Sequence, residues 1–470
     1  MPDTYDLIVI GAGPVGENVA DRAVQGGLSC VIVEDQLVGG ECSYWACIPS
    51  KALLGPPLAL AAARSIDGAK QAVTGSLDVD AVLARRDWFT GDWDDTGQVE
   101  WLASAHIDLV RGHGRLAGRN TVEVTAKDGT VRILTAKHAV AVCTGTTATI
   151  PNIPGLADAK PWTSREATSA KSVPGSLIVL GGGVVATEMA TAYGLFGCQV
   201  TMLVRSALLA GVEPFAGEMV AKSLADLGVD LRFGVSPTGV HRVDGRIEVA
   251  LDDGTTVVAD EILVATGRTP ATSDIGLPTV GLEPRGYLST DDTMLVKDTD
   301  WLYAVGDANG RVLLTHQGKY QARAAGDVIA ARALGKPVDD AQWGRHVATA
   351  DHGGVPQVVF SHPEVAAVGL TEAQAKKQYT NVRTVDYEIG HVSGAKLHAD
   401  GYQGRARMVV DTDREVIVGL TLVGPEVGEM IHAATIAVVG EVPISRLWHA
   451  VPSYPTMSEL WLRLLETYGR

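Results

Sequence analysis

The chain is poor in basic residues and in cysteine, and both shortages narrow the range of functions. It has 39 lysine and arginine residues against 55 aspartate and glutamate residues, which gives a formal net charge of −16. The negative charge is spread along the chain and argues against nucleic acid or an anionic membrane as a partner. Only five cysteines occur in 470 residues. We therefore expect a cytoplasmic protein whose cysteines are reduced, buried or catalytic.

We also expect no segment for export or membrane insertion. The first ten residues carry Asp3 and Asp6 where a signal peptide would have a basic region. No apolar run approaches about 20 residues, so no membrane span is predicted. With 46% hydrophobic and 20% charged residues, the chain has the composition of a folded enzyme with roughly two to four domains.

Two segments of the sequence share one plan, in which an apolar strand, a glycine-rich turn, a helix of small residues and a second strand follow each other. They are YDLIVIGAGPVGENVADRAVQGGLSCVIVED at 5–35 and SLIVLGGGVVATEMATAYGLFGCQVTMLVR at 176–205. Each predicts a βαβ unit of a doubly wound α/β fold whose turn and helix N-terminus bind a dinucleotide pyrophosphate. The fingerprint positions are Gly11, Gly13 and Gly16 in the first unit, and Gly181, Gly183 and Ala186 in the second.

The residue at the end of the second strand differs between the two units. Glu34 lies 18 residues past Gly16, where an acid accepts the ribose hydroxyls of an adenosine. The matching count from Gly181 reaches Val204, which is followed by Arg205. Because a guanidinium can bind a 2′-phosphate that a carboxylate would repel, NADPH is predicted at the second site, with NADH possible. The alternative is that Arg205 is only a solvated strand end.

The segment GGECSYWACIPSK at 39–51 places Cys42 and Cys47 five residues apart. A zinc site would need two further ligands nearby, so no metal site is predicted. A disulfide requires a helix start distorted enough to bring the two Cα atoms within about 6 Å. A helix N-terminus would also lower the pKa of a thiol there. The alternative for a cysteine is that it acts only as a small hydrophobic residue in the core. We favour this interpretation for the other three cysteines, Cys30, Cys143 and Cys198.

Taken in order, GGECSYWACIPSK, ATGRTP, LYAVGD and FSHPEVAAVGLTE resemble the motifs of the FAD-dependent pyridine nucleotide-disulfide oxidoreductases, the family of glutathione reductase, lipoamide dehydrogenase and mercuric reductase. The resemblance covers nearly the whole chain. It implies a redox-active disulfide in which Cys42 faces the substrate and Cys47 faces the flavin. It further implies that Lys51 lies near the flavin N5 and pairs with Glu188, and that Asp307 binds the ribityl or pyrophosphate region of FAD. The remaining predicted cofactor-binding positions are Gly40, Thr144, Gly145, Gly267, Arg268 and Gly306.

The sequence departs from this family near its end. The family's His-Pro-Thr motif is replaced by Tyr454, Pro455 and Thr456, whereas Glu459 is kept. A phenol with a pKa near 10 can donate a proton, but it is a poor base toward a thiol whose pKa is near 8.5. Efficient reduction of lipoamide or glutathione disulfide is therefore not expected. A packing aromatic is the alternative. Mercuric reductases resemble the chain in having this tyrosine, but they carry a C-terminal cysteine pair, and no cysteine follows Cys198 here.

These observations predict an α/β protein with two Rossmann-like dinucleotide-binding domains and a C-terminal α+β interface domain. The FAD domain is predicted at 1–152 and 271–346, the NAD(P) domain at 153–270 and the interface domain at 347–470. By resemblance the protein is a homodimer in which Tyr454 and Glu459 reach Cys42 of the other subunit. The predicted reaction passes hydride from NADPH through FAD to the Cys42–Cys47 disulfide and on to a small-molecule or protein disulfide. The alternatives are a metal ion or quinone as electron acceptor, or a flavin-bearing redox sensor without efficient turnover.

Overall fold

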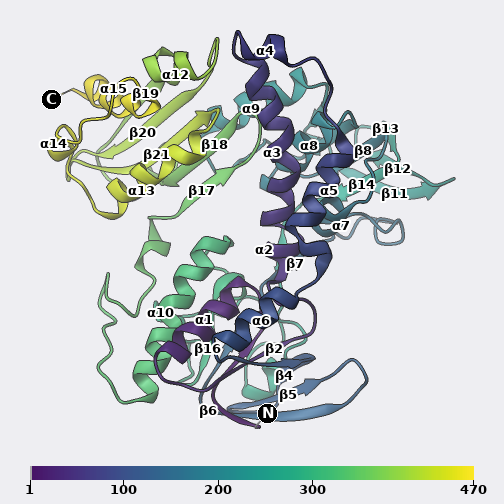
Figure 1. Cartoon of the computed structure of the whole chain (residues 1–470), viewed down its shortest axis with the longest axis vertical. Helices are drawn as coiled ribbons and strands as arrows, with labels where there is room; N and C mark the ends of the chain where they lie inside the picture. Colours follow the sequence, from purple (N-terminus) through teal and green to yellow (C-terminus); the bar gives the residue numbers. More distant parts are fainter. Residues whose placement is uncertain (1–2, 470) are drawn as a thin grey trace. The chain divides into compact units, whose positions relative to one another are not determined.

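A computed structural model describes residues 3–469, which divide into two compact units of mixed α/β structure (Figure 1). The first unit comprises the chain up to Pro49, Asp87–Ala148 and Arg268–Asp351. The second unit comprises Ser50–Arg86, Thr149–Gly267 and the chain from His352 onward. Two helices, α3 (Cys47–Arg64) and α5 (Val79–Phe89), cross the boundaries between these ranges.

The first unit is built on a twisted sheet whose central strand is β1 (Thr4–Ile10), paired in parallel with its neighbours on both sides. The sheet order is β3 (Asp108–Arg111), β2 (Cys30–Glu34), β1, β6 (Val131–Val142), β5 (Thr121–Thr125) and β4 (His113–Leu116), with β16 (Leu302–Ala304) on β6. A separate ribbon pairs β7 (Thr146–Ala148) with β15 (Arg268–Pro270). The helices are α1 (Pro14–Gln25), α2 (Gly40–Tyr44), α6 (Thr96–Ser104) and α10 (Thr315–Ala333).

Alternating residues of β1 enter two different hydrophobic cores. Leu7 and Val9 join the core beneath α1 and α10, whereas Ile8 and Ile10 join the core on the opposite face. Because successive side chains of a strand point to opposite faces, a strand covered on both sides must be apolar throughout. This requirement explains the unbroken apolar run before Gly11. The two helices α1 and α10 lie side by side over one face (Figure 1).

The second unit combines a parallel sheet with two antiparallel sheets. The parallel sheet is β10 (Asp230–Phe233), β9 (Gln199–Val204), β8 (Ser176–Leu180) and β14 (Glu261–Val264). The smaller antiparallel sheet is β11 (Pro237–Val243), β12 (Arg246–Leu251) and β13 (Thr256–Ala259). The larger one is β17 (Pro356–Val359), β18 (Glu364–Gly369), β21 (Val416–Gly424), β20 (Arg405–Asp411) and β19 (Val382–Glu388). The helices are α4 (Ala69–Ala72), α7 (Ser164–Ser169), α8 (Val184–Leu195), α9 (Pro214–Asp226), α11 (Glu372–Gln378), α12 (Ser393–His398), α13 (Ile431–Val439), α14 (Ile444–Leu447) and α15 (Leu460–Tyr468).

The C-terminal sheet shares its packing with the parallel sheet of the same unit. Val359, Val365 and Val423 belong to the same buried cluster as the side chains of β8 and β9. A charged contact adds to this packing, because Arg407 on β20 binds the buried carboxylate of Glu213 at 3.2 Å. The α/β class and the C-terminal α+β part are confirmed. The domain limits at 152, 270 and 346 stay predictions.

One segment, Gly40–Arg64, is long and apolar enough to cross a membrane by length and composition alone. The segment is not one uncharged run, because Glu41 and Lys51 lie within it, and the expectation that no membrane span occurs stays a prediction. The segment consists of two helices, because Trp45 leaves helical geometry with a φ of −137°. Lys51 lies within it and forms an ion pair with Glu188 at 2.8 Å. The break between the two helices and the ion pair are features of helices inside folded proteins. Such helices can also be long and apolar enough to pass a test of length and composition.

Candidate active site

The turn between β1 and α1 uses glycine for steric reasons at two of its three fingerprint positions. Gly11 has a φ of +102°, and a Cβ there would lie 2.6 Å from the carbonyl oxygen of Cys143. A Cβ at Gly16 would overlap the carbonyl oxygen of Gly11. A Cβ at Gly13 would meet nothing within 4 Å, and Gly13 gives α1 no side-chain cap. The turn therefore leaves open space before uncapped N–H groups, which suits a pyrophosphate.

The carboxylate of Glu34 closes this turn from the end of β2. It accepts hydrogen bonds from the backbone N–H of Ala12 at 2.7 Å and from that of Gln36 at 2.8 Å. Burial raises the pKa of Glu34, and the two N–H groups act in the opposite direction. An acidic acceptor thus stands beside the fingerprint, at the position predicted for the ribose contact. That contact itself stays a prediction.

Polar groups gather at the carboxyl ends of the neighbouring strands. Asp307 follows β16 and accepts a hydrogen bond from the Thr146 hydroxyl at 2.7 Å, while burial raises the pKa of Asp307. Arg268 donates to the same hydroxyl at 2.9 Å. The Thr144 hydroxyl is buried without a hydrogen-bond partner in residues 3–469. An orphaned hydroxyl, a buried carboxylate and a side-chain-free turn along one sheet edge fit a dinucleotide, so FAD fits the residues present.

The N-terminus of α2 and the turn after β16 each pack against the fingerprint region at a glycine. Gly40 has a φ of +59°, and a Cβ there would lie 2.8 Å from the Cα of Gly13. Gly306 has a φ of +71° and packs on Val15 of α1, while its N–H donates to the side chain of Gln321 at 2.8 Å. Gly145 also has a positive φ, of +70°. Gly40 and Gly306 therefore both lie against the fingerprint turn or the start of α1.

Cys42 lies in α2 and Cys47 begins α3. All five cysteines are present as thiols. The side chains of Cys42 and Cys47 are hydrogen-bonded to each other, and the Cys47 sulfur lies 3.3 Å from the hydroxyl of Thr315, the first residue of α10. On a continuous helix residues five apart would point about 140° apart. The break at Trp45 lets the two thiols meet, whereas the disulfide itself stays a prediction.

The expected effect of a helix N-terminus on the thiols was wrong for Cys42. Its pKa is raised, first by the hydrogen bond with Cys47 and then by burial, while Thr315 and Lys319 act in the opposite direction. Because α2 has only five residues, it offers little dipole to favour a thiolate. Local hydrogen bonding and burial therefore dominate at Cys42.

The predicted ion pair of Lys51 and Glu188 is present in the second unit. The Lys51 ammonium donates to Glu188 at 2.8 Å, and the other carboxylate oxygen accepts the N–H of Phe360 at 3.1 Å. The ammonium also lies 4.7 Å from the centre of the Phe360 ring. Glu188 is 4% exposed and Lys51 is 35% exposed. The pairing is confirmed, whereas its closeness to a flavin stays a prediction.

The second fingerprint repeats the backbone geometry of the first. Gly181 has a φ of +135°, and a Cβ there would overlap the carbonyl oxygen of Ala265. A Cβ at Gly183 meets nothing within 4 Å, and Gly183 gives α8 no side-chain cap. Ala186 is fully buried, and Arg205 is exposed beyond the end of β9. Gly267, with a φ of +148°, precedes β15.

The residues in place of the family's His-Pro-Thr motif differ sharply in exposure. Tyr454 is 74% exposed, so its ring is not packed within its own chain. Glu459 is 4% exposed, and Arg463 binds one of its carboxylate oxygens. The other oxygen has no hydrogen-bond partner in the described part of the chain. Their predicted approach to Cys42 of a second subunit stays a prediction.

Two contacts of the site have no local signature in the sequence. Thr315 meets Cys47 although 268 positions separate them, and Phe360 supports Glu188 across 172 positions. Thr315 begins α10, and Phe360 directly follows β17, but neither residue type indicates the contact that it makes. Only the folded chain brings them into the site.

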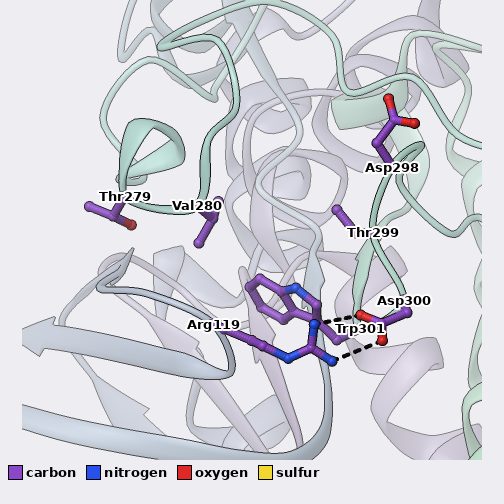
Figure 2. A pocket seen from close by; sticks show the side chains of 7 residues that line it. All are labelled: Arg119, Thr279, Val280, Asp298, Thr299, Asp300 and Trp301. Carbon is purple, nitrogen blue, oxygen red and sulfur yellow. Dashed lines mark hydrogen bonds and ion pairs between the residues drawn. The ribbon is translucent and has the colours of Figure 1, made fainter.

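A cavity in the first unit lies away from the fingerprint turn between β1 and α1 (Figure 2). Figure 2 shows an ion pair between Arg119 and Asp300, with a separation of 2.7 Å, beside Trp301 at the wall of the cavity. Trp301 precedes β16, which runs parallel to β6 and therefore to β1. The cavity thus lies at the amino ends of these strands, whereas dinucleotides bind beyond the carboxyl ends.

Comparisons with known proteins agree on one family. The family model "Pyridine nucleotide-disulphide oxidoreductase" matches residues 5–322, and the model of its dimerisation domain matches residues 355–464. A dihydrolipoyl dehydrogenase of Haloferax volcanii is 33% identical over 98% of this chain and 95% of its own length. A mercuric reductase of Staphylococcus aureus is 30% identical over 97% of this chain and 81% of its own. The solved structure of the HOCl-induced flavoprotein disulfide reductase RclA from Escherichia coli, as a Cu(II) complex, has a TM-score of 0.84 at 22% identity and covers 99% of both chains.

Proposed function

The chain belongs to the pyridine nucleotide-disulphide oxidoreductase family and is an FAD-dependent oxidoreductase that uses a pyridine nucleotide, and we propose that it passes electrons from NADPH through Cys47 and Cys42 to a small-molecule disulfide. The observation that carries this proposal is the hydrogen-bonded dithiol, which α2 holds against the fingerprint turn at Gly40. The dimerisation domain at residues 355–464 supports a homodimer.

Bound FAD supplies the chemistry that converts a two-electron hydride donor into a reductant for a disulfide. The protein's own residues carry out thiol exchange. The Cys42 thiolate attacks one sulfur of the acceptor disulfide, which forms a mixed disulfide and releases one thiolate. Cys47 then attacks the Cys42 sulfur, which restores the Cys42–Cys47 disulfide and releases the second thiolate. The Thr315 hydroxyl lies 3.3 Å from the Cys47 sulfur and can donate a hydrogen bond to the Cys47 thiolate.

The acceptor is tested by NADPH consumption with the flavin-loaded enzyme and a panel of small disulfides, quinones and Hg(II). We expect disulfide turnover in the native chain and in a Cys198→Ser control, because Cys198 is buried in the other unit. A Cys42→Ser variant should lose disulfide turnover. If quinone turnover survives in Cys42→Ser and no disulfide is ever reduced, the dithiol route is wrong.

A metal ion is the second candidate acceptor. The likeness to a mercuric reductase along 97% of this chain favours it, as does a phenol in place of the family histidine. The sequence has no cysteine after Cys198 to relay a metal, so Hg(II) would meet Cys42 and Cys47 directly. Hg(II)-dependent NADPH consumption that needs both thiols, without turnover of any disulfide, would favour this acceptor.

The preference for NADPH rests on Arg205. Arg205 is exposed and directly follows the last residue of β9, next to the position that matches Glu34 of the first fingerprint unit. Arg205→Ala should raise the Michaelis constant for NADPH by about tenfold, the loss of one charged hydrogen bond of roughly 1.5 kcal/mol. The constant for NADH should hardly change. Arg246→Ala, on an antiparallel strand of the same unit, is the control. Equal effects on both nucleotides would refute the assignment.

A further inference from the structure

A short helical turn, η1 (Gly91–Trp93), connects α5 with α6 (Figure 1). All three of its residues have positive φ values, of +55°, +52° and +60° in chain order. Glycine adopts this left-handed conformation readily, but Asp92 and Trp93 adopt it at a cost, and a bulky side chain there is an outlier. Such strain persists only where the surrounding structure holds the residue, so the contacts of Trp93 indicate what the turn does.

The indole of Trp93 contacts the helix that carries Cys42. Its N–H donates to the carbonyl oxygen of Tyr44 at 3.1 Å. Tyr44 is the last residue of α2 and lies directly before the break at Trp45. On a continuous helix this carbonyl would accept the backbone N–H of the residue four positions later. At the break the indole N–H takes the place of that donor, so Trp93 caps the C-terminal end of α2.

The chain before α2 is held by the same loop. The carboxylate of Asp95 accepts the backbone N–H of Val38 at 2.7 Å and forms an ion pair with Arg111 at 2.5 Å. Tyr44, at the other end of α2, is 1% exposed. The loop 91–95 therefore contacts the chain on both sides of the short helix, and the helix end at the break is buried and capped.

We propose that Trp93 is a positioning residue for the redox dithiol, an inference that rests on the proposed function. By capping the end of α2, the indole holds the break that lets Cys42 and Cys47 meet. A disulfide requires the two Cα atoms within about 6 Å of each other, whereas two thiols tolerate a wider separation. The indole therefore favours the disulfide over the dithiol. It lowers the reduction potential of the pair and makes the dithiol a stronger reductant.

The test is the equilibrium of the flavin-loaded enzyme with mixtures of reduced and oxidised dithiothreitol, without NADPH. In this exchange the reduced reagent closes to its cyclic disulfide, while the Cys42–Cys47 disulfide takes up two electrons and two protons. Alkylation and peptide mass spectrometry give the fraction of dithiol. Trp93→Phe keeps an aromatic ring but loses the N–H, so the equilibrium constant for reduction should rise about fivefold, the effect of one hydrogen bond. This rise corresponds to a potential about 20 mV higher.

A second variant separates the hydrogen bond from the backbone strain. Trp93→Gly removes the indole and also relieves the positive φ, which glycine adopts without strain. We expect the potential to rise in Trp93→Gly as it does in Trp93→Phe. Trp101→Phe, on α6 of the same unit, is the matched control and should leave the potential unchanged.

An unchanged potential in either Trp93 variant would overturn the proposal, so one variant still decides if the other fails to fold. Thermal unfolding is measured in parallel, because a merely structural role would lower the unfolding temperature without moving the potential. Failure of the proposed function would look different, since the native chain itself would then form no Cys42–Cys47 disulfide at any ratio of the reagent.

Discussion

The ion pair of Lys51 and Glu188 allows a quantitative prediction, because its two partners are unequally buried. Glu188 is 4% exposed and Lys51 is 35% exposed. The carboxylate accepts one hydrogen bond from the ammonium and one from the N–H of Phe360. Lys51→Met leaves a buried carboxylate with a single donor. Glu188→Gln leaves an ammonium that can still reach water, and the new amide oxygen can still accept the Phe360 N–H.

The magnitudes follow from this difference. Breaking a fully buried pair costs about 3–5 kcal/mol, but Lys51 is partly solvated, so we expect Lys51→Met to cost about 2 kcal/mol. Glu188→Gln should cost about 1 kcal/mol, the loss of one hydrogen bond to a group that water can satisfy. The double variant Lys51→Met/Glu188→Gln has no unpaired charge and should also cost about 1 kcal/mol. The coupling energy is then about 2 kcal/mol.

The assay is hydrogen–deuterium exchange of the amides in β8, which reports the free energy of opening of the second unit. The four proteins of the cycle are compared without added cofactor. Additive effects, with a coupling below about 0.5 kcal/mol, would show that the pair is screened like a surface contact. A larger cost for Glu188→Gln than for Lys51→Met would refute the reasoning from unequal burial.

Further substitutions separate folding from function. Gly13→Ala should weaken FAD binding, measured by FAD titration, and leave the unfolding temperature of the apoprotein unchanged. Gly16→Ala introduces a Cβ for which there is no room, so it should lower the unfolding temperature itself, measured by calorimetry. Arg407→Met should cost about 3 kcal/mol in urea unfolding, because Glu213 is buried beside it. The hydrogen bond from Arg407 is the main cause that holds the pKa of Asp386 below its usual value. This carboxylate therefore stabilises the fold fully above about pH 4 and less as the pH falls. Asp386→Asn should make the free energy of unfolding depend less on pH below about pH 4. Tyr454→His should gain disulfide turnover, and no change relative to Tyr454→Phe would assign the ring to packing between subunits.

The local parts of the fold could be predicted because their causes lie within short segments. The positive φ of Gly11 and the overlap at Gly16 arise from a single strand–turn–helix unit of the sequence. The same reasoning applies to Gly181. Long-range packing has no such local record. The shared core of β8 and β9 with Val359 and Val423 joins elements that strand patterns alone assign to separate domains.

The site could be predicted only in part, for a related reason. The pairing of Lys51 with Glu188 came from a family resemblance, since residue types alone do not connect positions 137 apart. The sign of the pKa change at Cys42 was predicted wrongly, because the sequence shows a helix start but not its length. A five-residue helix and a hydrogen-bonded neighbour reverse the expected effect. Electrostatics at this thiol depend on contacts that only the folded chain provides.

The two fingerprint turns show which residues the backbone requires and which it leaves free. In both turns the first glycine has a positive φ and lies against a carbonyl oxygen of the neighbouring strand end, so that residue is set by the fold. The strand-end residue is different. In the first turn Glu34 binds the N–H of Ala12 and so contributes to the closed turn. In the second turn the first glycine has an equivalent backbone conformation, although the strand ends at Val204 and is followed by Arg205. Because the second turn forms without a carboxylate, the strand-end position is not needed for folding there. It is therefore the position at which nucleotide preference can change without cost to the fold, which is why Arg205 is the residue to substitute.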